Sequence, residues 1–201
     1  MRSFRSYVGP AGAISFVSLA ASWLAIILLI THMPYLAIYS AVSAFFLDSL
    51  DCYVARKTNT ESDFGRQLDS MLDFFNYSVF AALLYFLYVS SDMLGFFVGF
   101  LILLFGAFRL VRFNVEGMLA KKSNKYYEGV VVCMVSLAVV VIFLINKVTI
   151  LPTIFSALVI TSLSFLQASR IPVRKTNYYF LWAAVAVGLV IFTYWVSLWK
   201  R

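Results

Sequence analysis

The sequence predicts an all-α integral membrane protein, a polytopic helical bundle of about seven spans within a range of six to eight. Hydrophobic residues make up 63% of the chain, whereas soluble domains are close to half apolar. Charged residues make up 12% and fall in clusters between long uncharged stretches. Several stretches reach the length of about 20 apolar residues that a spanning helix needs. Because there is no internal repeat and no soluble region, residues 1–201 are expected to form a single transmembrane domain.

Seven apolar runs define the expected spans in chain order. The first two runs meet at His32, and a lone histidine between apolar runs is typical of a boundary and not of a metal site. Polar connections at 56–65 and 114–126 end the second and fourth runs, whereas the fifth and sixth are separated by only a short interval. The spans are expected at 12–31, 35–55, 66–89, 93–113, 127–146, 150–167 and 177–199.

Lys and Arg residues are distributed unequally between the two ends of these spans. If the N-terminus is cytoplasmic, only Lys147, Lys200 and Arg201 of the 16 basic residues lie outside. Basic residues gather on the cytoplasmic side of membrane proteins, so we expect a multi-pass cell-membrane protein in this orientation. Because the basic residues lie at the ends of apolar runs and form no stripe, the net charge of +7 does not indicate nucleic acid binding. Contact with anionic lipid headgroups is a simpler role for them.

The cysteines and the first apolar run argue against a disulfide, a zinc site and a signal peptide. Cys52 and Cys133 lie in apolar surroundings without paired spacing, so we expect neither a disulfide nor a zinc site. The first run lacks a small-residue cleavage site and leads directly into another run, so no cleavable signal peptide is expected.

Four aspartates lie at the ends of the second and third apolar runs. Asp48 and Asp51 are three residues apart, and both residues of such a pair share one helical face. The same holds for Asp69 and Asp73, which are four apart. Because the two spans are antiparallel neighbours, all four carboxylates are expected at one depth near the cytoplasmic boundary. Each costs up to roughly 3 kcal/mol near a helix centre and repels the others, so a hard cation such as Mg²⁺ or Mn²⁺ is expected among them.

Small and polar residues accompany the carboxylates. Ala55 and Gly65 each lie four residues from an aspartate, on the same face, and leave room for a bulky ligand near the backbone. Arg56 supplies a fixed positive charge and Ser62 a hydroxyl, both of which suit a phosphate. One acidic pair alone is more simply explained by chance near a helix end, but the joint spacing is not.

The joint spacing reads Asp48-x2-Asp51-x3-Ala55-Arg56-x8-Gly65-x3-Asp69-x3-Asp73. It resembles the signature of the CDP-alcohol phosphatidyltransferases, D-x2-D-G-x2-A-R-x8-G-x3-D-x3-D, with seven of eight fixed positions present. Cys52 stands where the family has Gly, so the backbone there is expected to approach the ligand less closely. The motif at 48–73 covers about an eighth of the chain, and the predicted membrane topology also fits the family.

The resemblance implies a chemistry and a role for each matching residue. Enzymes of this family transfer a phosphate-linked group from a CDP-activated donor to a hydroxyl acceptor and release CMP. Asp48, Asp51 and Asp69 resemble the metal ligands, and Asp73 resembles a general base that also contacts the metal. The residues expected at the cytidine nucleotide and its pyrophosphate are Cys52, Ala55, Arg56, Ser62 and Gly65.

The segment FRLVRFNVEG after the fourth run bears on the acceptor. Arg109, Arg112 and Asn114 resemble the R-x2-RFN element of the phosphatidylserine synthase branch. Two arginines beside the site suit a carboxylate, so the implied acceptor is L-serine and the implied donor CDP-diacylglycerol or CDP-archaeol. Glycerol 3-phosphate or inositol phosphate would also be attracted, and the arginines have a simpler explanation as positive-inside residues or ligands of the donor phosphate.

A cation or proton transporter is the alternative from another class of function. It predicts a line of carboxylates across the membrane, whereas this sequence concentrates the motif aspartates at one depth. A scaffold without catalysis leaves the spacing unexplained. The small and β-branched residues of the last three spans are candidates for a homodimer interface, by analogy with the family alone.

Overall fold

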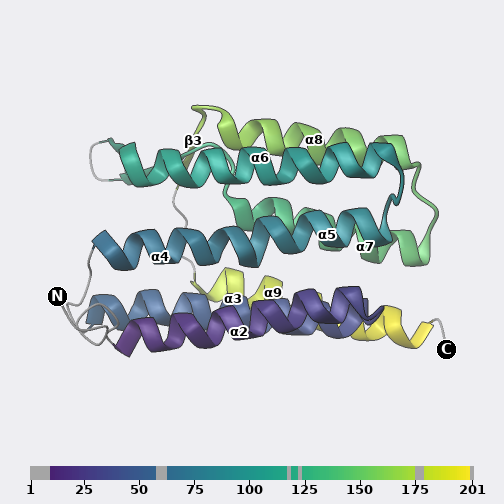
Figure 1. Cartoon of the computed structure of the whole chain (residues 1–201), viewed down its shortest axis with the longest axis horizontal. Coiled ribbons are helices and arrows are strands. Elements are labelled where there is room, and N and C mark those ends of the chain that lie inside the picture. The colour runs from purple at the N-terminus through teal and green to yellow at the C-terminus, as the bar shows by residue number, and fades with distance from the viewer. Residues whose placement is uncertain (1–9, 58–62, 117–118, 122–123, 175–178, 200–201) are drawn as a thin grey trace.

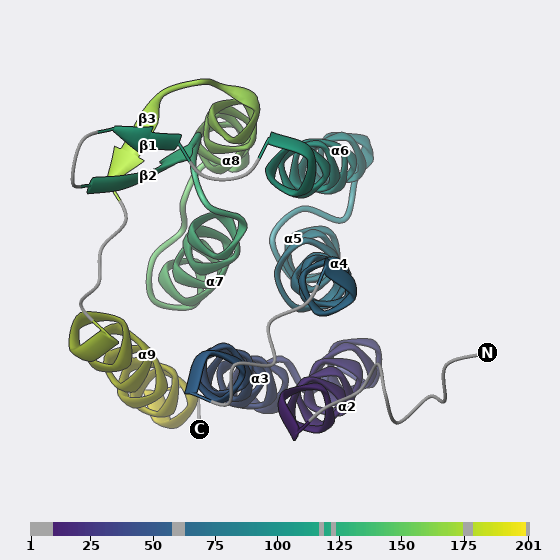
Figure 2. The ribbon, with the colours of Figure 1, turned by 90° about the vertical axis from the view of Figure 1, so that its left-hand side faces the viewer.

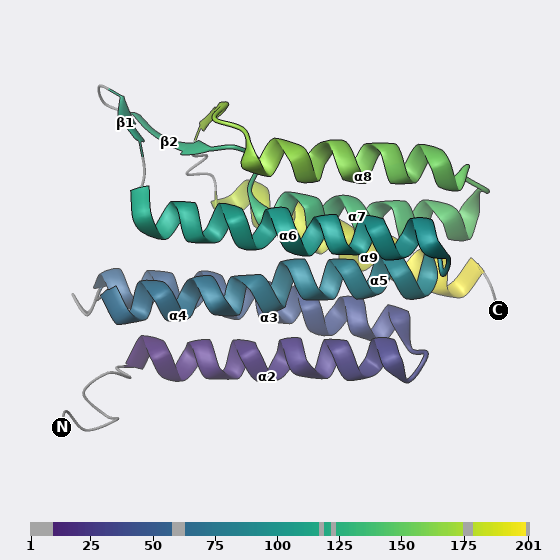
Figure 3. The ribbon, with the colours of Figure 1, turned by 45° about the horizontal axis from the view of Figure 1, so that its top comes forward.

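The structure is a computed structural model that describes residues 10–57, 63–116, 119–121, 124–174 and 179–199. Within these ranges, seven long helical segments run along one common axis (Figure 1), which confirms the predicted helical bundle. A small three-stranded sheet, which the sequence did not predict, lies at one end of the bundle (Figure 3). We call this end, where α3 ends and α4 begins, the site end.

The helices follow the expected order along the chain. The third predicted span is one continuous helical segment made of α4, a π-helix η1 and α5. The elements are α2 (Pro10–Ile30), α3 (Pro34–Lys57), α4 (Asp63–Asp73), η1 (Phe74–Val79), α5 (Phe80–Tyr88), α6 (Met93–Glu116), β1 (Leu119–Lys121), β2 (Asn124–Glu128), α7 (Val132–Val148), α8 (Thr153–Ala168), β3 (Pro172–Arg174) and α9 (Tyr179–Trp199).

The helices are arranged in rows when viewed along the bundle (Figure 2). The helices α2, α3 and α9 form one row, α5 and α7 lie beside each other above it, and α6 and α8 form the row beyond. The core lies between these rows, where Leu29, Ile38, Tyr85 and Phe143 are fully buried. The α4–α5 segment contacts both α2 and α6, so it is enclosed on several sides by other helices.

The outer surface of the bundle is strongly apolar. On α6, for example, Phe96, Phe97 and Phe100 are each more than half exposed. In the part of the chain that the structure describes, three helical segments, at Gly12–Ile30, Phe64–Tyr88 and Met93–Glu116, are long and apolar enough to cross a membrane, whereas α7 and α8 are shorter. A helical bundle that exposes so many large apolar side chains is a membrane protein, as the composition indicates.

The fifth helix begins later than the sequence predicted. Expected at residue 127, it begins at Val132 because the residues before it form strand β2, which pairs with both β1 and β3. Gly129 then turns the chain into α7 with a φ of 71°, where a Cβ would lie 2.5 Å from the carbonyl oxygen of Gln167. The sheet therefore joins the ends of α6 and α8 to the beginning of α7.

The π-helix η1 widens the third segment directly after Asp73. It buries three consecutive residues, Asn76, Tyr77 and Ser78. The Asn76 side-chain nitrogen donates to Ser18 Oγ on α2 at 3.2 Å, and its oxygen accepts a hydrogen bond from Ser22. Polar groups inside a membrane bundle need partners within the protein, and these serines supply them.

Candidate active site

Three of the four motif aspartates converge at the site end of the bundle. Asp48 and Asp51 lie in the last turns of α3, and Asp69 lies in α4, the next helix along the chain. One carboxylate oxygen from each of the three lies within 4.8 Å of the others. The helical spacing of the sequence therefore does bring carboxylates of two separate helices together.

Asp73 lies next to this group but outside it. Its carboxylate interacts electrostatically with those of Asp48 and Asp69 and with the guanidinium of Arg109 of α6. Among the described residues, the carboxylates close enough to share one ion are those of Asp48, Asp51 and Asp69. Asp73 thus interacts with carboxylates of the cluster and also with a guanidinium.

The hydrogen bonds of the carboxylates leave room for a cation. Asp48 accepts a hydrogen bond from the Tyr77 hydroxyl through Oδ2 at 3.0 Å, whereas its Oδ1 is buried without a hydrogen-bond partner in the described part of the chain. Asp51 Oδ2 accepts a 2.5 Å hydrogen bond from Ser15 Oγ. An all-oxygen set with a buried, unsatisfied carboxylate oxygen fits a hard divalent cation such as Mg²⁺ or Mn²⁺.

The last turns of α6 approach the carboxylates with polar side chains. Arg109 is 5% exposed, and Asn114 accepts a 3.0 Å hydrogen bond from Ser70 Oγ, next to Asp69 in α4. A small recess beside them is lined by Arg109, Arg112, Phe113, Glu116 and Glu128. The recess brings side chains of both charge signs together.

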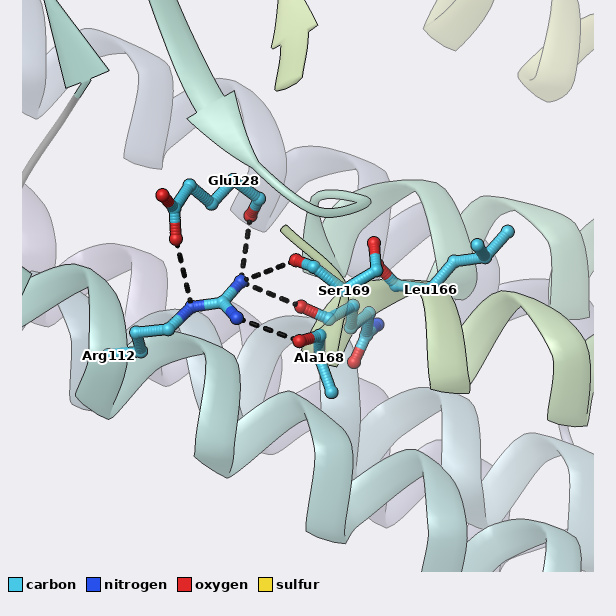
Figure 4. A network of polar contacts seen from close by, with 6 residues as sticks. Arg112, Glu128, Leu166, Ala168 and Ser169 are labelled. Carbon is cyan, nitrogen blue, oxygen red and sulfur yellow. Dashed lines mark hydrogen bonds and ion pairs between the residues drawn. The ribbon is translucent and has the colours of Figure 1, made fainter. Parts of the chain in front are cut away.

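Arg112 makes a dense set of contacts with the protein itself (Figure 4). Its Nη1 donates to the carbonyl oxygen of Ala168 at 2.8 Å, and its Nη2 lies 2.9 Å from that of Ser169. Nη2 also lies 3.2 Å from the carbonyl oxygens of Gln167 and Glu128, and Nε lies 3.7 Å from Glu128 Oε2. Arg112 therefore joins the end of α8 to strand β2, although it shares the recess with Arg109.

The predicted nucleotide-binding residues are described only in part. Ser62 lies outside the described residues, and so do the side chains of Cys52, Ala55 and Arg56, whose backbone belongs to α3. Gly65 lies in the first turn of α4 and is exposed. Their roles toward the nucleotide therefore stay predictions.

Sequence reasoning missed the hydroxyl groups that surround the carboxylates. Ser15, Ser18 and Ser22 of α2 are spaced by three and four residues and are all buried. A serine row with helical spacing in an otherwise apolar span indicates a buried polar face, and this was the signal available in the sequence. Tyr77 carried no such signal, because its position depends on the π-helix.

Known proteins resemble this chain in sequence. It is 40% identical over 83 residues to the CDP-diacylglycerol–serine O-phosphatidyltransferase of Helicobacter pylori, covering 40% of this chain and 35% of that protein. It is 36% identical over 122 residues to the enzyme of the same name from Methanocaldococcus jannaschii, covering 59% and 57%. With the archaetidylserine synthase of Methanothermobacter thermautotrophicus, the identity is 33% over 117 residues, covering 57% and 50%.

These matches extend over about a third to just over half of the length of the relatives. The family model described as CDP-alcohol phosphatidyltransferase covers much more of this chain, from residue 10 to residue 191. That range includes the aspartates of α3 and α4 and the arginines of α6. The chain belongs to the CDP-alcohol phosphatidyltransferase family.

Proposed function

We propose that this protein transfers a phosphatidyl or archaetidyl group from a CDP-activated lipid to the hydroxyl of L-serine and releases CMP. The observation that carries the proposal is the convergence of Asp48, Asp51 and Asp69, with Asp73 and Arg109 beside them. The names of the related serine transferases support the choice of acceptor.

Each side chain then has a distinct role in the transfer. Asp48, Asp51 and Asp69 would hold a divalent cation, which when bound would neutralise charge that builds on the departing CMP. Asp73 accepts the proton of the serine hydroxyl as this oxygen attacks the phosphorus atom of the lipid phosphate. Arg109 and Asn114 hold the serine carboxylate, and Arg112 fixes the wall of the recess.

The lipid part of the donor stays on the apolar side of the carboxylates. A cavity of about 80 Å³ between α3, η1, α7 and α9 is lined mainly by apolar side chains and extends to Tyr77, the partner of Asp48. We therefore place CDP-diacylglycerol or CDP-archaeol with its head at the site end and its chains toward the bilayer.

In the cell, we propose that residues 1–201 form a single catalytic domain of the cell membrane, with the site at the cytoplasmic face. We also propose that the protein assembles as a homodimer.

The direct test is CMP release by the purified protein from CDP-diacylglycerol and from CDP-archaeol with a panel of acceptors. We expect release with L-serine and Mn²⁺ or Mg²⁺, and none after chelation. If glycerol 3-phosphate or inositol phosphate supports release and serine gives no more than water, the acceptor is assigned wrongly. Metal-dependent ion flux in liposomes without CMP release would instead favour a transporter.

A further inference from the structure

Two carboxylates of the metal-binding group are each held by a hydroxyl from another helix. The hydroxyl of Ser15, on α2, donates to Oδ2 of Asp51 at 2.5 Å. The hydroxyl of Tyr77, on η1, donates to Oδ2 of Asp48 at 3.0 Å. Both donors are 8% exposed, so water competes little for these hydrogen bonds.

The hydrogen bonds distinguish the two oxygens of Asp48. An ionised carboxylate has two equivalent oxygens and rotates readily, so a cation alone does not fix which oxygen binds it. The Tyr77 bond occupies Oδ2 and leaves Oδ1 buried without a hydrogen-bond partner among the described residues. The hydrogen bond from Tyr77 therefore leaves Oδ1 of Asp48 as the oxygen available to a cation.

The positions of both hydroxyls are fixed by packing. Tyr77 lies in the π-helix, and its ring contacts that of Phe45 on α3 at a centroid distance of 6.4 Å. Ser15 begins the serine row of α2, whose next member, Ser18, donates to the carbonyl oxygen of Ala44 on α3 at 3.0 Å. The helical segment that carries each donor is therefore itself packed against α3.

We propose that Ser15 and Tyr77 are positioning residues that orient Asp51 and Asp48 for a divalent cation, an inference that rests on the metal site of the proposed function. Outer partners of metal ligands fix ligand orientation, and their loss typically weakens metal binding by about 10- to 100-fold. Neither residue belongs to the signature motif, so the motif alone does not describe the cation site of this chain.

The test measures Mn²⁺ binding by electron paramagnetic resonance on purified protein without substrate. We expect Tyr77→Phe and Ser15→Ala each to raise the Mn²⁺ dissociation constant about 10- to 100-fold, and Ser15→Thr, which keeps the hydroxyl, to restore binding to within about threefold of the original. CMP release by the two weakened variants should recover as Mn²⁺ is raised, whereas a merely structural defect would not respond to metal.

Matched controls remove similar hydroxyls far from the carboxylates. Tyr85→Phe removes a buried hydroxyl that lies 3.0 Å from Ser156 Oγ, and Ser164→Ala removes one that donates to the carbonyl oxygen of Ile160. Both should bind Mn²⁺ as the original protein does. The inference is overturned if Tyr77→Phe and Ser15→Ala bind Mn²⁺ normally, or if the controls weaken binding equally. If the unchanged protein binds no Mn²⁺, the metal site of the proposed function itself fails.

Discussion

At the scale of single residues, the four motif aspartates have different electrostatic surroundings. Asp48 interacts with the charges of Asp69 and Asp51, whereas Asp73 also interacts with the positive charge of Arg109. The positive charge of Arg109 is what distinguishes the surroundings of Asp73 from those of Asp48. This difference separates the proposed roles of base and ligand.

Replacing Asp73 by Asn tests that separation. We expect Asp73→Asn to lower kcat for CMP release by about 10²- to 10⁴-fold, because the serine hydroxyl loses its proton acceptor. Mn²⁺ binding should change little, whereas Asp48→Asn should abolish both binding and activity. Steady-state kinetics and Mn²⁺ titrations of both variants check this. Loss of Mn²⁺ binding in Asp73→Asn would show that Asp73 acts mainly as a metal ligand.

The two arginines of α6 are expected to respond differently to substitution. Arg109→Gln should raise the KM for serine about 10- to 100-fold, since charge-assisted hydrogen bonds contribute about 1.5–3 kcal/mol. Arg112→Gln should leave the KM within about threefold but destabilise the fold by on the order of 2 kcal/mol, because buried carbonyl oxygens lose their donor. Serine kinetics and thermal unfolding measure both effects. Equal rises in KM would mean that Arg112 binds serine as well.

At the scale of elements, the π-helix determines how three helices meet the α4–α5 segment. Asn76 contacts the serines of α2, Tyr77 contacts Asp48 of α3, and Ser78 faces Gly106 of α6. A Cβ added at Gly106 would lie 2.3 Å from Ser78 Oγ and 3.1 Å from its Cβ. The missing side chain at Gly106 is what allows α6 to approach η1 so closely.

A double-mutant cycle tests this close approach. Gly106→Ala should destabilise the protein by about 1–3 kcal/mol, because the added methyl group overpacks the interface. The same change in a Ser78→Gly background should cost much less, since the crowded side chain is gone. Thermal or denaturant unfolding of the four proteins gives the coupling. Equal costs in both backgrounds would show that Ser78 does not limit the approach.

The predictable parts of the fold follow from helical periodicity and apolar length. Residue spacing predicted that Asp48 and Asp51 share a face, and charge clusters located the helix ends to within a few residues in most cases. The three-stranded sheet was missed because β2 pairs with β3, whose residues are distant in sequence and separated from it by two helices. Its short strands carry little local signal.

The site was predictable only where the residues are chemically distinctive. Carboxylates in an apolar chain are conspicuous, whereas Ser15 and Tyr77 resemble many other hydroxyl residues of a membrane helix. The π-helix breaks the period of 3.6 residues on which the spacing argument depends, so the direction of Tyr77 was not available. The contacts of Arg112 with main-chain carbonyl oxygens likewise depend on how α8 ends.

At the scale of the whole molecule, the charged residues divide between the two ends of the bundle. Lys57, Arg109 and Arg112 lie near the end where α3 and α6 stop, whereas Lys147 lies in the last turn of α7. Because α7 begins where α3 and α6 end, Lys147 lies at the opposite end (Figure 3). Basic residues gather on the cytoplasmic side of membrane proteins, so this distribution favours a cytoplasmic site end.

Single cysteines test the orientation in a variant from which Cys52 and Cys133 have been removed. We expect a cysteine at Lys57 to react with a membrane-impermeant maleimide only in inside-out vesicles, and one at Lys147 only in right-side-out vesicles. The basic residues near the site end favour this sidedness. The reverse labelling pattern would place the carboxylates outside and contradict the proposed location.

The shortness of α8 has a consequence for the surrounding lipid. Its 16 residues extend over about 24 Å, less than the hydrocarbon thickness of about 30 Å, and Ile154, Phe155 and Leu158 point outward. Hydrophobic mismatch of this kind is relieved by local thinning of the bilayer. We expect CMP release to be faster in vesicles of short-chain lipids than in vesicles of long-chain lipids. The length of the acyl chains that surround the protein would then control its rate of transfer.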